Sequence, residues 1–152
     1  MLCGIQGAGK TAFYAERFLD THARVSLDLL RTRHREARFL ELCLETRMPF
    51  VVDNTNPTRA ERARYVRPAL AHGFRVVAYW VDVAPRVAID RNATRSRRRR
   101  VPVTGILGTR KRLELPSAGE GFAELWRVVA EGGRFEVTPL ERPEAPLTAT
   151  GG

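Results

Sequence analysis

Cysteine, lysine and long apolar segments are all scarce in this sequence. The two cysteines, Cys3 and Cys43, have a separation that suits neither a disulfide framework nor a zinc site. No apolar run approaches the roughly 18 residues of a membrane span, and the N-terminus has no signal-peptide pattern. These absences predict a soluble cytoplasmic protein that does not contact membranes.

The length of the chain limits it to one domain of ordinary size. It has 152 residues, of which 43% are hydrophobic and 8% aromatic, which indicates a globular protein rather than a disordered one. The segment 139–152 is rich in proline, threonine and glycine. We therefore expect one folded domain over residues 1–138, followed by a disordered tail over residues 139–152.

Positive charge is concentrated in one segment. The chain has 26 basic and 17 acidic residues, a formal net charge of +9, and only Lys10 and Lys111 among the basic residues are lysines. Residues 86–112 contain ten basic residues and a single acid, Asp90, so this segment alone accounts for the excess. Such a block is typical either of a site for a polyanion or of a solvated charged surface.

The apolar pattern alternates between short strands and helices. Strands are expected near 24–26, 50–53, 75–83 and 135–137, and helices near 12–20, 28–46, 57–71, from 85 through the arginine block, 104–112 and 120–129. Alternation of this kind predicts an α/β fold with a mostly parallel central sheet flanked by helices, and with a small arginine-rich helical lid.

Residues 4–11 read Gly-Ile-Gln-Gly-Ala-Gly-Lys-Thr and match the phosphate-binding pattern G-x-x-x-x-G-K-[ST] in full. In this pattern, backbone N–H groups surround the phosphates, the lysine reaches the β- and γ-phosphates, and the threonine hydroxyl binds Mg²⁺. It predicts ATP and Mg²⁺ as cofactors, with nucleotide contacts from Gly4, Gly7, Ala8, Gly9, Lys10 and Thr11. Only three residues precede Gly4, so the strand expected before the loop is short. An ordinary glycine-rich turn is the alternative.

Two aspartates are candidates for further roles. Asp53 follows the apolar residues Val51 and Val52, as expected of a second Mg²⁺ ligand at the end of a buried strand, or it forms a turn with the residues after it. Asp28 follows the second expected strand, where a general base for an acceptor hydroxyl would face the nucleotide. Arg31 lies on the same helical face, suited to an acceptor phosphate. A helix cap with an exposed arginine is the alternative for this pair.

Taken together, these motifs resemble the 5′-hydroxyl polynucleotide kinase domain of phage and animal end-healing enzymes. The resemblance runs from about residue 3 to residue 130, through GIQGAGKT, SLDLLR at 26–31, VVDNTNPTRAERARYV at 51–66, the helix carrying Arg91 and Arg95, VPV at 101–103 and GEGFAELW at 119–126. It implies ATP-dependent transfer of the γ-phosphate to a 5′-hydroxyl end of DNA or RNA. No D-x-D-G-T pattern occurs, so the phosphatase that often accompanies this kinase is absent from this sequence.

The resemblance also implies residue roles. Asp28 corresponds to the general base and Arg31 to the contact with the acceptor phosphate, while Arg91 and Arg95 correspond to lid arginines that act on the ATP phosphates. Ser26 and Leu27 replace the usual Asn-Arg before the base, and the arginine block is one residue longer than usual, so Arg97 is an alternative to Arg95.

Two other functions fit the same sequence. Many small P-loop kinases share these features and act on a small metabolite, a nucleoside or a nucleotide. A non-catalytic nucleotide-binding module is the second alternative, indicated by the short first strand and the unusual residues before Asp28.

Overall fold

A computed structural model describes residues 1–140 of the chain; the predicted tail lies outside them except for Pro139 and Leu140. The strands are β1 (Leu2–Cys3), β2 (Ala23–Val25), β3 (Phe50–Val52), β4 (Val77–Asp82), β5 (Glu124–Glu131) and β6 (Arg134–Pro139). The helices are α1 (Lys10–Arg17), α2 (Leu27–Leu30), α3 (Arg33–Glu45), α4 (Arg59–Ala71), α5 (Pro85–Ala93) and α6 (Val103–Arg112), with a 3-10 turn η1 (Ala118–Glu120).

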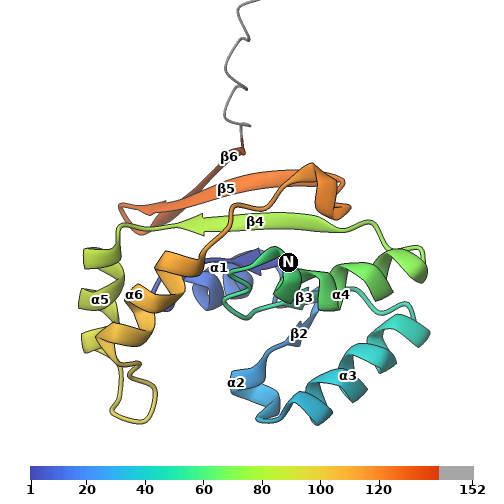
Figure 1. Ribbon diagram of the computed structural model, residues 1–152, viewed down its shortest axis with the longest axis horizontal. Helices are drawn as coiled ribbons and strands as arrows, with labels where there is room; N and C mark the ends of the chain where they lie inside the picture. The colour runs from blue at the N-terminus through green and yellow to red at the C-terminus, as the bar shows by residue number, and fades with distance from the viewer. Residues whose placement is uncertain (141–152) are drawn as a thin grey trace, which may run out of the picture.

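The strands form two neighbouring sheets that are mostly parallel. One sheet has the order β1-β4-β5-β6, in which only β6 is antiparallel, and the other pairs β2 with β3 in parallel. Figure 1 shows helices covering this layer, with α5 and α6 on one side of the molecule and α2 and α3 on the other. The expected α/β fold is confirmed.

Hydrogen bonds from the loop after β3 join the two sheets beside the short strand β1. Asn56 Nδ2 donates a hydrogen bond of 2.7 Å to the carbonyl of Leu2, and the N–H of Gly4 donates one of 2.9 Å to the carbonyl of Thr55. Asn56 is buried and has a positive φ of 45°. The loop after β3 therefore supplies hydrogen bonds to β1 and to Gly4 that a neighbouring strand would otherwise make. These bonds fix the start of the phosphate loop against the end of β3.

The helix predicted for residues 28–46 is wrong in one respect, because it is two helices. α2 ends at Leu30, Arg31 follows it with a φ of 72° in the left-handed region, and α3 starts after Thr32. The Thr32 side chain caps α3 by accepting a hydrogen bond from the N–H of Arg35. The break separates Asp28 from the long helix and leaves it on a short turn beside the end of β2.

The helix predicted for residues 120–129 is also wrong, since this segment is strand β5. Each residue from Glu124 to Val129 pairs with a residue of β4, from Val77 to Asp82, and Val128 is fully buried. Gly121, with a φ of 101°, ends η1 before the strand begins. The central position between β4 and β6 outweighs the helical pattern of the local sequence.

The five arginines between Arg95 and Arg100 lie in a loop between α5 and α6, not on the helix predicted to run from residue 85 through the arginine block. α5 ends at Ala93, and the buried Asn92 closes the loop by bonding both backbone groups of Val101. Its Nδ2 donates to the carbonyl at 2.7 Å and its Oδ1 accepts from the N–H at 2.9 Å. Residues 94–100 therefore extend from a closed base, and we call them the arginine loop.

In the described part of the chain, three apolar clusters hold the layers together, and two of them are large. One packs α1, α5 and α6 on the four-stranded sheet through residues such as Phe13, Val81 and Ile106, and the other packs α3 and α4 on β2 and β3. Among residues 1–140, no helix is long and apolar enough to cross a membrane.

Candidate active site

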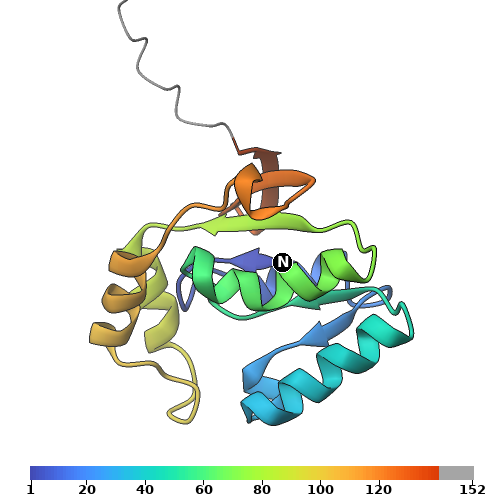
Figure 2. The same cartoon turned by 45° about the vertical axis from the view of Figure 1, so that its right-hand side comes forward.

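A single large cleft collects most of the predicted site residues. It has a volume of about 1260 Å³ and is lined by the phosphate loop, α2, the loop after β3, α4 and the arginine loop. In Figure 2 the arginine loop and α2 face each other across this part of the molecule. The predicted residues that line the cleft are Gly7, Gly9, Lys10, Thr11, Asp28, Arg31, Asp53 and Arg95.

Three predicted residues lie outside the lining, namely Gly4, Ala8 and Arg91. Arg91 nevertheless reaches the phosphate loop, because its Nη1 donates a hydrogen bond of 3.2 Å to the carbonyl of Ala8. Of the two candidates for the second lid arginine, Arg95 lines the cleft and Arg97 does not. Arg95 therefore lies in the same cleft as the other predicted site residues, whereas Arg97 does not.

The phosphate loop has the conformation that its sequence predicts. Gly9 precedes α1 with a φ of 102°, and Lys10 begins the helix. Lys10 Nζ donates hydrogen bonds to the carbonyls of Gly4 (2.9 Å) and Ile5 (2.8 Å). Burial lowers the pKa of Lys10 to about 8, although the charge of Asp53 acts in the opposite direction. The ammonium group is thus held over the loop, where the helix N-terminus also favours an anion.

Replacing Gly7 with alanine should disable this loop. Gly7 has a φ of 81°, and a Cβ there would lie 2.4 Å from the carbonyl oxygen of Ala88. The left-handed backbone alone costs a non-glycine residue about 1–2 kcal/mol, and the clash adds to it. We expect a lower unfolding midpoint and at least tenfold weaker binding of a fluorescent ADP analogue.

Gly108→Ala is the matched control. Gly108 lies within α6, and nothing comes within 4 Å of a Cβ built there. Alanine should therefore leave nucleotide binding unchanged and stabilise the helix by about 0.5–1 kcal/mol. Equal nucleotide affinity in both variants would contradict the close fit at Gly7.

The side chains of Thr11 and Asp53 meet at the floor of the cleft. Thr11 Oγ1 donates a hydrogen bond of 2.8 Å to Asp53 Oδ2, and Asp53 is buried. Both are hard oxygen ligands of the kind that Mg²⁺ prefers. Among residues 1–140, no group of three or more histidine, cysteine or acidic side chains is placed to hold a metal. This donor set fits Mg²⁺ that is shared with nucleotide phosphates rather than enclosed by protein.

Asp28 lies on α2 in the same cleft, and a buried network that the sequence did not reveal holds this helix in place. Asn54 Oδ1 accepts a hydrogen bond of 2.9 Å from the N–H of Leu27, the first residue of α2. Asn54 Nδ2 donates to Glu36 Oε2 at 3.0 Å, and the hydroxyl of Tyr65 donates to Glu36 Oε1 at 2.7 Å. Glu36 lies on the buried side of α3, and a glutamate at such a position of a helix is the signal in the sequence that could have pointed to this network.

Arginine dominates the walls of the cleft. Eight arginines line it against three acids, Asp28, Asp53 and Glu61. Within residues 1–140, no ion pair involves any arginine of the arginine loop, nor Arg31 or Arg64. The sequence predicts catalytic roles for two of the eight, Arg31 and Arg95, and the complete set is Arg24, Arg31, Arg33, Arg64, Arg95, Arg98, Arg99 and Arg100.

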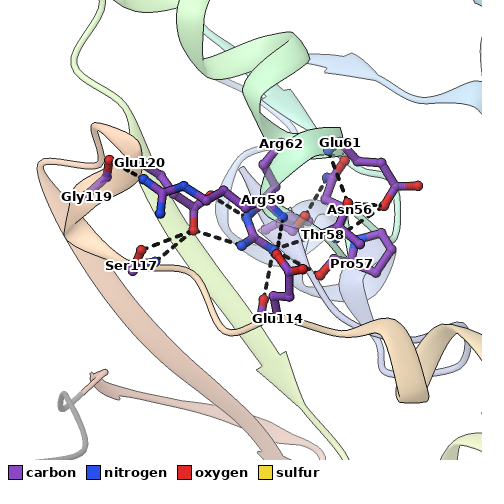
Figure 3. A network of polar contacts seen from close by, with 11 residues as sticks. Asn56, Pro57, Thr58, Arg59, Glu61, Arg62, Glu114, Ser117, Gly119 and Glu120 are labelled. Atoms are coloured by element: carbon purple, nitrogen blue, oxygen red, sulfur yellow. Dashed lines mark hydrogen bonds and ion pairs between the residues drawn. The ribbon is translucent and has the colours of Figure 1, made fainter. Parts of the chain in front are cut away.

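A buried ion pair supports the loop that joins the two sheets (Figure 3). Arg62 of α4 is fully buried and binds both carboxylate oxygens of Glu120, with N–O distances of 2.7 and 2.8 Å. Its Nη1 also donates to the carbonyls of Asn56, Pro57 and Glu114. Arg62 thus ties the segment after α6 to the loop that holds the phosphate loop in place.

The fold and the phosphate-loop sequence define a P-loop protein with an α/β architecture. Residues 26–116, more than half of the chain, match the protein family described as AAA domain. The chain therefore belongs to this family.

A solved structure supports the architecture independently. A gluconokinase from Sinorhizobium meliloti 1021 is 19% identical in sequence and superposes with a TM-score of 0.56. The match covers 84% of this chain and 79% of that chain. At this level of identity the comparison shows a shared fold, and the acceptor of this chain is a separate question.

Proposed function

We propose that this protein is an ATP-dependent phosphotransferase whose acceptor is an alcohol that carries negative charge. The observation that carries the proposal is the shared cleft, in which Asp28 lies with Lys10 and Thr11 between walls rich in arginine. A nucleotide accounts for the phosphate loop, but it does not require a carboxylate on α2 or arginines on both sides of that carboxylate. These features suit a second, anionic substrate.

The nucleotide would bind with its phosphates on residues 4–11. Lys10 is placed to contact the β- and γ-phosphates, and Arg91 and Arg95 would add positive charge from the other side. Mg²⁺, when bound with ATP, neutralises phosphate charge, and Thr11 and Asp53 are the residues that would hold it. Arg91 already contacts the loop through Ala8, which supports its assignment.

Asp28 would act on the acceptor. Its carboxylate accepts the hydroxyl proton as the acceptor oxygen forms a bond to the γ-phosphorus and the bond to the β–γ bridging oxygen breaks, so that ADP leaves. Arg31, three residues away, would hold an anionic group of the acceptor. The hydrogen bond from Leu27 to Asn54 fixes the start of α2, which supports a defined position for this carboxylate.

Two classes of acceptor satisfy these requirements. The likeness to a gluconokinase supports a small anionic alcohol, such as a sugar acid or a nucleotide, better than it supports a polynucleotide. A 5′-hydroxyl end of DNA or RNA is the second candidate. Arg98, Arg99 and Arg100 favour it, because they line the cleft in addition to Arg95 and could follow a phosphate backbone.

An acceptor screen tests the proposal. Purified protein is incubated with Mg²⁺, γ-labelled ATP and a panel of sugar acids, nucleosides, nucleotides and 5′-hydroxyl oligonucleotides of both sugars. We expect label transfer to one class, at least 100-fold above a Lys10→Ala control. Nucleotide binding without transfer to any acceptor would contradict the proposal and favour a non-catalytic module.

Ionic strength separates the two acceptor classes. An oligonucleotide makes several phosphate contacts, so its KM should rise steeply as salt increases from 50 to 200 mM. A small acceptor with one or two charges should show a change of only a few fold. The slope of log KM against log salt therefore distinguishes the candidates, even if both classes accept label.

A further inference from the structure

Arg24 occupies a position in the cleft that the phosphate loop pattern does not require. It lies in the middle of β2, where it pairs with Val51 of β3, and its side chain is 24% exposed. Its Nη2 atom lies 2.7 Å from Asp53 Oδ2 and 3.2 Å from Thr11 Oγ1. Its Nε donates a hydrogen bond of 2.8 Å to the same Asp53 oxygen.

These contacts bridge the two oxygens that would hold Mg²⁺. Thr11 Oγ1 donates its proton to Asp53 Oδ2, and it accepts a hydrogen bond from Arg24 through a lone pair. Mg²⁺ binds oxygen at about 2.0–2.1 Å and demands near-octahedral geometry, so it requires that lone pair and the space around it. The guanidinium nitrogen and the metal therefore exclude each other at Thr11.

The burial of Asp53 explains why a cation belongs at this position. The side chain of Asp53 is only 2% exposed, and a buried carboxylate without a counter-charge is strongly destabilising. Arg24 supplies this charge, and the Tyr14 ring lies 6.0 Å from its guanidinium carbon. Because the side chain is partly exposed, it can turn toward solvent when another cation arrives.

We propose that Arg24 takes the place of the metal in the nucleotide-free protein and competes with it, so that Arg24 sets how much the metal adds to nucleotide affinity. This inference rests on the proposed function, since it assumes that nucleotide and metal bind at residues 4–11. It assigns Arg24 to the metal subsite and requires no particular acceptor.

The test compares nucleotide affinity with and without metal. A fluorescent ADP analogue is titrated into the wild-type protein and into Arg24→Gln, in EDTA and in Mn²⁺. The Kd in EDTA divided by the Kd in Mn²⁺ gives the metal contribution to nucleotide affinity. Hydrogen bonds to charged groups contribute enough to change this ratio on the order of tenfold. We expect the ratio to rise by about that factor in Arg24→Gln, because metal binding no longer displaces a guanidinium.

Two further variants make the result specific. Arg17→Gln removes a charge from α1, where Arg17 pairs with Glu16 on the surface, and should keep the wild-type ratio. Arg24→Lys keeps the charge without the two-nitrogen contact, so it should raise the ratio to a value between those of the wild-type protein and Arg24→Gln. It provides the test if Arg24→Gln does not fold.

The outcomes separate this inference from the proposed function. An unchanged or lower ratio in the Arg24 variants would overturn the inference, as would an equal rise in Arg17→Gln, which would indicate a general charge effect. If no acceptor is labelled but the ratio still rises in Arg24→Gln, the proposed function fails and the inference about Arg24 holds. Absence of nucleotide binding by the wild-type protein would overturn both.

Discussion

Replacing Asp28 with asparagine should lower kcat by about 10²–10⁴-fold, the usual contribution of a positioned general base. Asparagine has nearly the same shape as aspartate but cannot accept the acceptor proton. The backbone of α2 is held by Ser26, Asn54 and the helix itself rather than by the Asp28 side chain, so the fold should persist. Steady-state kinetics with the acceptor found in the screen measure the effect.

Asp20→Asn is the control for this variant. Asp20 is exposed in the turn after α1 and does not line the cleft, so kcat should match that of the wild-type protein. The Kd of the ADP analogue should change little in Asp28→Asn, because the carboxylate acts on the acceptor. A kcat within threefold of wild type in Asp28→Asn would refute the assignment of Asp28 as the base.

Replacing Arg62 with methionine should be the most destabilising single change outside the cleft. The variant leaves Glu120 as a buried charge without a partner and removes donors from three carbonyl groups. Breaking a buried pair in this way costs about 3–5 kcal/mol. For a domain of this size, the midpoint of thermal unfolding should fall by roughly 6–20 °C, as measured by circular dichroism.

Arg75→Met breaks an exposed pair of the same residue types and provides the comparison. Arg75 and Glu124 are 62% and 39% exposed, and such surface pairs contribute less than about 1 kcal/mol. Adding Glu120→Gln to Arg62→Met should recover part of the loss, because the unpaired charge is then removed. Equal shifts for Arg62→Met and Arg75→Met would show that the buried network contributes little.

The sequence predicts the fold class and the nucleotide end of the cleft because both depend on local patterns. The phosphate loop is eight contiguous residues, and its glycines and Lys10 adopt the arrangement that the pattern implies. The short β-branched strand before Asp53 is equally local. Asp28 and Arg31 line the same cleft as these residues, as expected for side chains that follow neighbouring parallel strands. The roles of Asp28 and Arg31 stay predictions.

The errors and omissions come from contacts between distant segments. The sequence predicts a helix where strand β5 lies, because the partner strand β4 is more than 40 residues earlier in the chain and local patterns do not show the pairing. The arginine loop is closed by Asn92 across nine residues. Arg24 reaches Asp53 across 29 residues from the middle of a strand, and no spacing rule identifies such a contact.

Transfer of the γ-phosphate of ATP to an acceptor alcohol in this cleft is tested most directly by measuring both products of one reaction. ADP, phosphorylated acceptor and inorganic phosphate are quantified together with the acceptor found in the screen. We expect one phosphorylated acceptor for each ADP, little free phosphate, and loss of both products in Lys10→Ala. ADP matched by free phosphate with every acceptor would contradict this transfer and indicate an ATP hydrolase.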